Sequence, residues 1–346
     1  MNRTAMVTGA NGHLGRNLVL ALLERGYDVR ATVRDASDPA KTANLPVGDI
    51  DLVSLDVRDE KRFAQLSAGI ETLFHAAATY KYYTGSRAAD EDMIRDSTEG
   101  AAAALRAAAA NRIARVVFTS SVVTVPVVEA GGPPTTEDEW CTDMRMPYFR
   151  AKVEAEREAW RIAEGEGIDM VAVLPGAIIG PGFSRTTPST DAILSIMLGG
   201  MKTGAPDTNF PAVDIRDVVS GHILAAESGK GGRFLIVNDE LPSFLAITRV
   251  MHEIDPSIPE TKRKLPDFAL ILGPFFDWLN HKMLRTPRLL TGEFVASVRG
   301  KEWTMSNARA KRELGWRQQI PLRQSLADTI TTLGACRVKK DSGYPL

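Results

Sequence analysis

"MVTGANGHLGRNL", residues 6–18, joins a short apolar run to a helical pattern through three glycines. Gly9, Gly12 and Gly15 recur at every third position of this stretch. Such a turn needs φ values that glycine tolerates, lets the backbone approach a pyrophosphate, and presents the N–H groups of a helix to the anion. The stretch therefore predicts a dinucleotide-binding turn between a first strand and a first helix, with a ligand-free turn as the alternative.

The rest of the first half alternates short β-branched runs with helical patterns. Strands that alternate with helices pair in parallel and are covered on both faces, so this order predicts a parallel sheet with right-handed crossovers. We expect strands at 4–8, 28–33, 50–55, 72–76, 115–120, 169–174 and 233–238, and helices at 14–25, 100–111, 148–165 and 213–227. The predicted fold class is α/β, a Rossmann-type doubly wound parallel sheet with a smaller, discontinuous C-terminal substrate domain.

The composition changes after Pro175, and this change sets the expected domain boundaries. Residues 176–212 are rich in Gly, Pro, Ser and Thr, which favours a loop-built pocket wall. The prolines expected to break the helices of 240–310 are Pro242, Pro256, Pro259, Pro266, Pro274 and Pro287. We expect an NADP(H)-binding domain over 1–175, completed by about 213–238, a substrate-binding region over 176–212 and 239–330, and a frayed polar tail over 331–346.

Composition and charge exclude several classes of protein. The formal net charge of −1 provides no overall field that would attract nucleic acid or an anionic membrane. Cys141 and Cys336 are the two cysteines, so we expect no disulfide framework and a reducing compartment, and no His/Cys spacing suggests a metal site. The apolar stretch 268–279 is too short and interrupted to cross a bilayer, and the first strand leaves no room for a signal peptide. A soluble cytoplasmic protein without nucleic-acid or membrane partners is the expectation.

The end of the second strand, "ATVRDASDPAK" at 31–41, bears on the type of cofactor. An acidic residue there would accept hydrogen bonds from the adenosine 2′-hydroxyl, whereas a cation would pair with a 2′-phosphate. Arg34 and Lys41 favour NADP(H), although Asp35 could serve NAD(H) if Arg34 pointed away. Asp56 and Val57, just beyond the third strand, are placed to meet the adenine ring. The small residues Ala76, Ala77 and Ala78 end the fourth strand and allow the cofactor to lie against the backbone.

Three polar residues form the candidate catalytic group. "VFTSSVVTV" (117–125) ends the fifth strand, so Ser121 emerges at the carboxyl edge of the sheet, where open α/β folds bind ligands. Tyr148 and Lys152 in "MPYFRAK" (146–152) are four positions apart and share one helix face. A cation one turn from a phenol favours the phenolate, which would draw the tyrosine pKa from about 10 towards the working range. The alternative is a solvated helix face that carries the pair by chance.

Together these residues resemble the extended short-chain dehydrogenase/reductase (NAD-dependent epimerase/dehydratase) superfamily, from "TGANGHLG" to "NARAKRELGW". The segments "ATVRD", "VFTSS", "YFRAK" and "PGAIIGP" are most similar to the dihydroflavonol 4-reductase, cinnamoyl-CoA reductase and aldehyde reductase group. The resemblance implies that Ser121 polarises a carbonyl, that Tyr148 donates the proton, and that Lys152 holds the nicotinamide ribose. The residues expected around the cofactor are Gly9, Asn11, Gly12, His13 (its side chain facing solvent), Leu14, Gly15, Arg34, Lys41, Asp56, Val57, Ala76, Ala77, Ala78, Tyr148, Lys152, Pro175, Ile178 and Ser189.

The sequence departs from the superfamily pattern at two points. Many members carry an Asn that relays protons in the helix after the fourth strand, and "DSTEGA" offers Ser97 there. The usual Tyr-Gly after the strand-end Ser is replaced by "TVP". Both departures favour the reductases over the sugar-nucleotide epimerases.

The leading hypothesis is an NADPH-dependent ketone or aldehyde reductase that acts on a small, apolar or aromatic substrate. Tyr80, Tyr82 and Trp140 are the candidate substrate contacts, with loop packing as the alternative for the tyrosines. Phe275, Phe276 and Trp278 favour a core or an oligomer interface over interfacial membrane docking through the same segment. Competing hypotheses are a sugar-nucleotide epimerase or dehydratase with retained cofactor, a 3β-hydroxysteroid dehydrogenase-like alcohol oxidation, and a non-catalytic NADP-sensing binder. The chain is expected to be a monomer, or a homodimer through helices 98–111 and 148–165.

Overall fold

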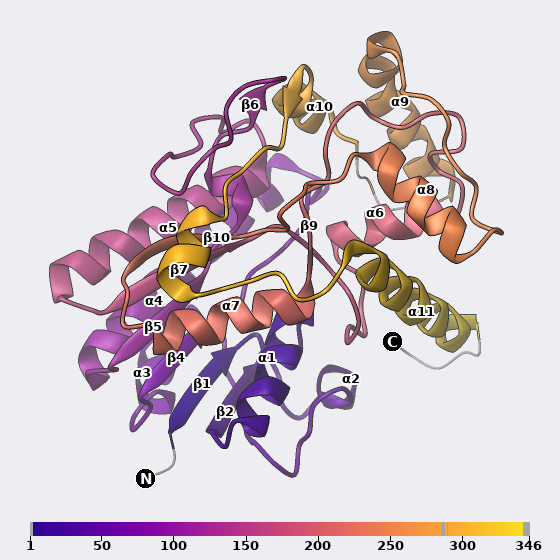
Figure 1. Ribbon diagram of the computed structural model, residues 1–346. Coiled ribbons are helices and arrows are strands. Elements are labelled where there is room, and N and C mark those ends of the chain that lie inside the picture. Colours follow the sequence, from indigo (N-terminus) through magenta and orange to yellow (C-terminus); the bar gives the residue numbers. More distant parts are fainter. Residues whose placement is uncertain (1–2, 285–287, 289, 342–346) are drawn as a thin grey trace.

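A seven-stranded parallel sheet forms the centre of the protein (Figure 1). The computed structural model describes residues 3–284, 288 and 290–341. The strands lie in the order β10-β7-β5-β4-β1-β2-β3, and every adjacent pair is parallel. Their bounds are β1 (Thr4–Thr8), β2 (Asp28–Val33), β3 (Asp51–Ser54), β4 (Thr72–His75), β5 (Arg115–Thr119), β7 (Met170–Pro175) and β10 (Gly232–Ile236). The expected Rossmann-type α/β fold is confirmed.

The strands read as continuous apolar runs because both faces of the sheet are buried. Successive side chains of a strand point to opposite faces. Met6 and Val116 therefore pack under α3 (Glu60–Leu66), α4 (Arg87–Asn111) and α5 (Pro147–Glu166). Val7 and Val117 pack on the other face under α1 (His13–Glu24) and α7 (Ile215–Glu227). Figure 1 shows these two helix layers on opposite sides of the sheet.

Helix α4 is longer than the sequence pattern predicted. It starts at Arg87 rather than 100, because the Ser86 side chain accepts a hydrogen bond from the N–H of Ala89 and caps the helix. The alanines of its second half are buried against α3, α5 and the sheet, as expected for a crossover helix with small side chains.

The C-terminal half contains more regular structure than expected. Two short strands, β8 (Ala177–Ile179) and β9 (Ala212–Asp214), pair in parallel, and α6 (Pro188–Met197) interrupts the expected loop because Thr187 and Thr190 cap it reciprocally. The remaining elements are α2 (Pro39–Thr42), η1 (Val122–Thr124), β6 (Val128–Glu129), α8 (Phe244–Ile254), α9 (Asp267–Leu284), α10 (Gly292–Val298), β11 (Lys301–Glu302), η2 (Ala310–Leu314) and α11 (Leu322–Asp341).

Two expectations about this half are wrong, and others fall outside the described residues. Pro274 lies inside α9 and does not end it. A frayed polar tail was expected from residue 331. Up to Asp341 this segment is instead the second half of α11, and its Leu333 is buried against α6 and α8. This separate apolar cluster supports, as a proposal, the division into a cofactor domain and a substrate region. Pro287 and residues 342–346 lie outside the described part of the chain. Within that part, no helix has the length and apolarity needed to cross a membrane.

Candidate active site

The glycine turn forms where β1 meets α1, next to the point where the strand order reverses between β1 and β4. Gly9 has a φ of +67°, and a Cβ there would lie 2.8 Å from the Cα of Ala77. A Cβ on Gly15 would lie 2.2 Å from the carbonyl oxygen of Gly9. The Gly12 N–H donates to that same oxygen at 3.0 Å. The three glycines therefore let α1 begin directly against the turn, as a pyrophosphate cradle requires.

We expect Gly15→Ala to destabilise the protein by about 1–3 kcal/mol, because its methyl group would overlap backbone that cannot move aside. The same change should abolish binding of a nicotinamide dinucleotide. Urea unfolding and fluorescence titration with NADPH and NADH measure the two effects. Gly165→Ala, in α5 with no atom within 4 Å of the new Cβ, is the matched control and should stabilise by about 0.4–1 kcal/mol. Equal effects of the two substitutions would contradict the role given to the turn.

Thr8 ties the end of β4 to this turn. Its Oγ1 accepts hydrogen bonds from the N–H groups of Ala76 and Ala77, both at 3.1 Å, and shares a hydrogen bond of 3.1 Å with Nδ1 of His75. His75 is a core residue, as expected, and burial lowers its pKa to about 3, so it is neutral. Thr8 thus holds the small residues after β4 beside Gly9, although the side chain of Ala78 is exposed.

The residues after β2 and β3 occupy the expected edge of the sheet. Arg34 is exposed, whereas the Nζ of Lys41 lies 3.1 Å from a carboxylate oxygen of Asp38 and 4.0 Å from one of Asp35. The guanidinium of Arg58 binds both carboxylate oxygens of Asp56 and holds the Asp56 pKa at about 2. Asp56 is therefore an anion paired with the Arg58 cation. The next residue, Val57, packs against Gly100.

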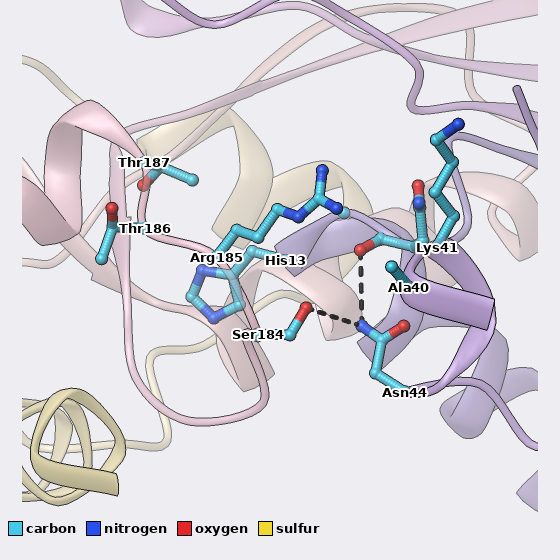
Figure 2. Close-up of a pocket in the computed structure, with 10 residues that line it drawn as sticks. His13, Ala40, Lys41, Asn44, Ser184, Arg185, Thr186 and Thr187 are labelled. Carbon is cyan, nitrogen blue, oxygen red and sulfur yellow. Dashed lines mark hydrogen bonds between the residues drawn. The ribbon is translucent and has the colours of Figure 1, made fainter. Parts of the chain in front are cut away.

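A pocket of about 220 Å³ opens beside the glycine turn (Figure 2). Four residues predicted to contact the cofactor line it: Asn11, Gly12, His13 and Lys41. Sequence reasoning missed the others: Ala40, Asn44, Ser184, Arg185, Thr186 and Thr187. Asn44 closes one side, because its Nδ2 donates to the carbonyl oxygen of Asn11 and to Oγ of Ser184, each at 3.4 Å.

His13 does not face solvent, so that expectation is wrong. Its Nε2 is 2.9 Å from the carbonyl oxygen of Pro181, and the ring of Phe183 packs edge-on at 5.0 Å. The segment after β8 covers the start of α1, and the resulting burial lowers the His13 pKa to about 4. Its buried Nδ1 has no hydrogen-bond partner among the described residues. Leu14 is likewise a core side chain, so only its backbone is available to a ligand.

These observations fit a dinucleotide cofactor. Gly9 and Gly15 allow this tight turn because they lack Cβ atoms that would meet its backbone, and a tight turn of this kind is what a pyrophosphate cradle requires. Lys41 and Arg185 bring two cationic side chains to one pocket beside the turn. Cations and helix N–H groups are the donors that phosphate oxygens prefer. Pro175, which ends β7, and Ile178 in β8 lie beyond the same sheet edge.

Ser121 and Tyr148 meet at the carboxyl end of β5. Ser121 caps η1, and its hydroxyl lies close enough to the Tyr148 hydroxyl, in the first turn of α5, to lower the pKa of Tyr148. The ammonium of Lys152, one turn further along α5, donates to the carbonyl oxygen of Thr119 at 3.1 Å. All three side chains are more than nine-tenths buried. The structure therefore brings the predicted catalytic residues to one buried place, whereas Ser97 is bound to the carbonyl oxygen of Met93 in its own helix.

The pKa values in this cluster differ from the expectation that Lys152 lowers that of Tyr148. Burial raises the pKa of Tyr148 well above its ordinary value, and the neighbouring Tyr80 adds to this; only the Ser121 hydroxyl lowers it. Burial also lowers the pKa of Lys152 to about 8, opposed by the charge of Glu156. Desolvation therefore dominates both pKa values, and it favours the protonated phenol of Tyr148.

An aromatic group covers Tyr148. The ring of Tyr80 lies 4.7 Å and that of Tyr82 lies 5.7 Å from the Tyr148 ring, measured between centroids. The Tyr80 hydroxyl is 3.0 Å from Oγ of Ser189, which places Ser189 on the Tyr80 side of the site. Phe294 of α10 stacks on Tyr82 at 5.6 Å, a contact that no motif in the sequence signalled. Tyr80, Tyr82 and Phe294, together with Tyr148, are named the aromatic cluster.

Trp140 is used differently from the other predicted substrate residues. The guanidinium carbon of Arg233 lies 3.8 Å above its ring, and that of Arg157 lies 5.1 Å away. These cation–π contacts place the indole against the buried ion pair between Arg233 and Glu156. The contacts of Trp140 are therefore structural, whereas the rings of Tyr80 and Tyr82 pack against Tyr148.

Comparison with known proteins finds a matching family and individual relatives. A model of the NAD dependent epimerase/dehydratase family matches residues 5–238. A Synechocystis sp. protein provisionally named dihydroflavonol 4-reductase is 32% identical over 336 residues, 94% of this chain and 92% of its own. Cinnamoyl-CoA reductase CAD2 of Medicago truncatula is 29% identical, covering 75% of this chain and 82% of its own. Dihydroflavonol 4-reductase of Zea mays is 34% identical, covering 67% and 69%.

Solved structures share the whole fold. The crystal structure of gox2253 superposes with a TM-score of 0.80 at 26% identity, over 100% of both chains. The UDP-glucose 4-epimerase of Thermotoga maritima, solved with UDP-glucose, gives a TM-score of 0.74 at 19% identity, over 96% of this chain and 99% of its own. At that identity the second likeness is one of fold alone.

Proposed function

The chain belongs to the NAD dependent epimerase/dehydratase family, and from this membership we propose that it is an NADPH-dependent reductase of small, apolar or aromatic aldehydes or ketones. The observation that carries the proposal is the burial of Tyr148 beside Ser121 at the carboxyl edge of the sheet, the edge at which the glycine turn also lies. The similarity to dihydroflavonol 4-reductase and cinnamoyl-CoA reductase supports reduction as the reaction.

The proposed mechanism assigns one task to each polar side chain. Bound NADPH supplies the hydride for the carbonyl carbon. Tyr148 donates its hydroxyl proton to the carbonyl oxygen as negative charge develops there, and Ser121 donates a hydrogen bond to the same oxygen. Lys152, with a pKa of about 8, carries a positive charge at neutral pH and stabilises the phenolate that Tyr148 becomes. The aromatic cluster excludes water and offers apolar surface to the substrate.

The test of the function is an NADPH-oxidation screen over structurally diverse aldehydes, ketones and diketones, run beside NADH. Stoichiometric oxidation of NADPH with formation of the alcohol is the expected result. An enzyme that retains tightly bound cofactor through purification and oxidises no added NADPH would instead be an epimerase or dehydratase.

Lys41→Ala is expected to raise the KM for NADPH about tenfold and to leave the KM for NADH within about twofold. The reason is the loss of a charge-assisted hydrogen bond to the 2′-phosphate, for which about 1.5–3 kcal/mol is typical. Steady-state kinetics with both cofactors measure the change. Lys61→Ala, exposed on α3, is the control. Equal changes for NADPH and NADH would remove Lys41 from 2′-phosphate binding.

Titration of Lys152 predicts the alkaline side of the pH profile. Its pKa of about 8 means that the ammonium charge is present below pH 8 and lost above it. The raised pKa of Tyr148 puts loss of the phenol proton at higher pH. We therefore expect kcat/KM for NADPH, which reports groups of the free enzyme, to be level below about pH 8 and to fall about tenfold per unit above it. A profile that stays flat to pH 9.5 would contradict this assignment.

A further inference from the structure

Helix α9 exposes an apolar face, and it lies outside the residues that match the family. Seven of its large apolar side chains are between 39% and 71% exposed. They are Phe268, Ile271, Leu272, Phe275, Phe276, Trp278 and Met283. At 3.6 residues per turn they occupy one side of the helix, an arc of roughly 160°. We name these seven residues the α9 face.

The opposite side of α9 faces the protein. Asp277 lies there and its carboxylate accepts a hydrogen bond from Nε of Arg288 at 3.0 Å. Gly273 lies on the same side, where a Cβ would be 2.3 Å from Leu290. The helix thus turns the carboxylate of Asp277 inward and its large apolar side chains outward, the reverse of an ordinary surface helix. Exposed apolar surface of this extent marks a binding site.

Positive charge surrounds the α9 face. Residues 261–290 contain six Lys or Arg and two Asp or Glu, although the whole chain has a net charge of −1. Lys262, Arg263 and Lys264 are exposed just before the helix. Lys282 is exposed within the apolar arc, with its Nζ 4.9 Å from the centre of the Trp278 ring. Trp, Phe and Leu on one face with flanking lysines are the composition of helices that lie in the surface of an anionic bilayer.

A groove of about 420 Å³ runs between α9 and α10. Its apolar walls include Ile271 and Pro274 of α9 and Val295 and Ala296 of α10. Arg145 and Arg299 also line it, and Arg299 has no ion-pair partner among the described residues. Apolar walls beside a guanidinium suit a molecule with an acyl chain and an anionic headgroup.

We propose that the α9 face docks the protein on an anionic lipid surface, with Phe275, Phe276 and Trp278 inserted between headgroups. Lys282, Lys262 and Arg263 would bind these headgroups, whereas Lys264 pairs with Asp207 at 2.7 Å. A second copy of the chain fits this face less well. A two-fold interface would bring the same basic segment of each copy together, and like charges repel. The expectation of no membrane partner came from the net charge, whereas the local charge around α9 is opposite in sign.

Docking would bring the candidate active site to the lipid. Tyr83, which follows the aromatic cluster residue Tyr82, contacts the ring of His281 at 5.6 Å and the guanidinium of Arg288 at 4.8 Å. Figure 1 shows α9 at the periphery, away from the strands of the sheet. The loop that covers Tyr148 therefore packs against the inward side of α9, behind the docking surface.

Vesicle co-sedimentation of the full chain, without NADPH or carbonyl, tests the proposal. We expect binding to phosphatidylcholine vesicles containing phosphatidylglycerol, weaker binding to phosphatidylcholine alone, and loss of binding as salt rises. Phe275→Ser combined with Phe276→Ser should lower the partition coefficient at least about tenfold. Lys282→Glu should weaken binding to the anionic vesicles only. Val47→Ser and Lys61→Glu, at exposed positions elsewhere, are the matched controls.

Two results would overturn the proposal. One is the absence of binding to anionic vesicles at low salt by the unaltered protein. The other is a dimer that the Phe275/Phe276 double variant converts to a monomer without any vesicle binding, which would make the face a contact between copies. Because no cofactor or substrate is present, a protein inactive in every carbonyl screen can still bind vesicles, so the two proposals fail separately.

Discussion

Tyr148→Phe should lower kcat for carbonyl reduction by about 10²–10⁴-fold, the range typical of a lost general acid. The substitution removes one oxygen, and the phenyl ring still fills the space against Tyr80 and Tyr82. Stability should therefore change by less than about 1 kcal/mol. NADPH affinity should stay within about twofold, because the proton donor is needed only when charge develops on the carbonyl oxygen.

Stopped-flow NADPH oxidation and equilibrium NADPH binding separate these effects. Tyr82→Phe is the matched control, since it removes a hydroxyl from the same aromatic cluster and leaves the Tyr148 hydroxyl in place. It should retain kcat within a few-fold. A Tyr148→Phe enzyme with nearly full activity would exclude the phenol as the acid, and a loss of NADPH binding equal to the loss of rate would show a role in binding.

Arg233→Met should lower the free energy of unfolding by about 3–5 kcal/mol, the usual cost of leaving a buried charge without its partner. Glu156 is fully buried, and its carboxylate accepts hydrogen bonds from Nε of Arg233 at 2.7 Å and from Oγ of Ser120 at 2.5 Å. The same guanidinium donates to the carbonyl oxygens of Glu137 and Glu139. Its removal would leave the buried carboxylate without its cationic partner, although Ser120 and Trp160 still donate to it, and would take this donor from the two carbonyl oxygens.

The matched control lies on α5, the helix that carries Glu156. Arg161→Met breaks an exposed ion pair with Glu158 on α5, and solvent-exposed pairs contribute about 0–1 kcal/mol. In urea unfolding, Arg233→Met should lose several times as much stability as Arg161→Met. Comparable losses would show that the buried network with Glu156 contributes little. Because Glu156 follows Lys152 by one turn and Ser120 precedes Ser121, the Arg233 variant should also lose activity.

Local sequence patterns predicted where the glycine turn, Ser121 and Tyr148 lie in the fold. Gly9 to Gly15 predicted the turn because glycine is the residue that allows its close backbone approaches. Ser121 and Tyr148 follow from a strand end and a helix start, both of which are local features. Their proposed roles stay predictions until the variants are measured. The pKa of Tyr148 was predicted in the wrong direction, because its burial under Tyr80 depends on a loop 68 residues away in sequence (148 minus 80).

The remaining site residues carried no local signal. Arg185, Phe294 and the burial of His13 arise where segments distant in sequence meet over the glycine turn and over Tyr148. The Arg233–Glu156 pair likewise joins β10 to α5. No periodicity in either segment indicates such a contact.

The sequence by itself determined the parallel sheet, its helix layers and the carboxyl-edge position of Ser121, Tyr148 and Lys152, because hydrophobic period and glycine stereochemistry act over a few residues. Tertiary structure alone decided which charges are buried, how each pKa moves and which face of α9 meets solvent. Desolvation and long-range packing depend on neighbours that a local pattern does not contain.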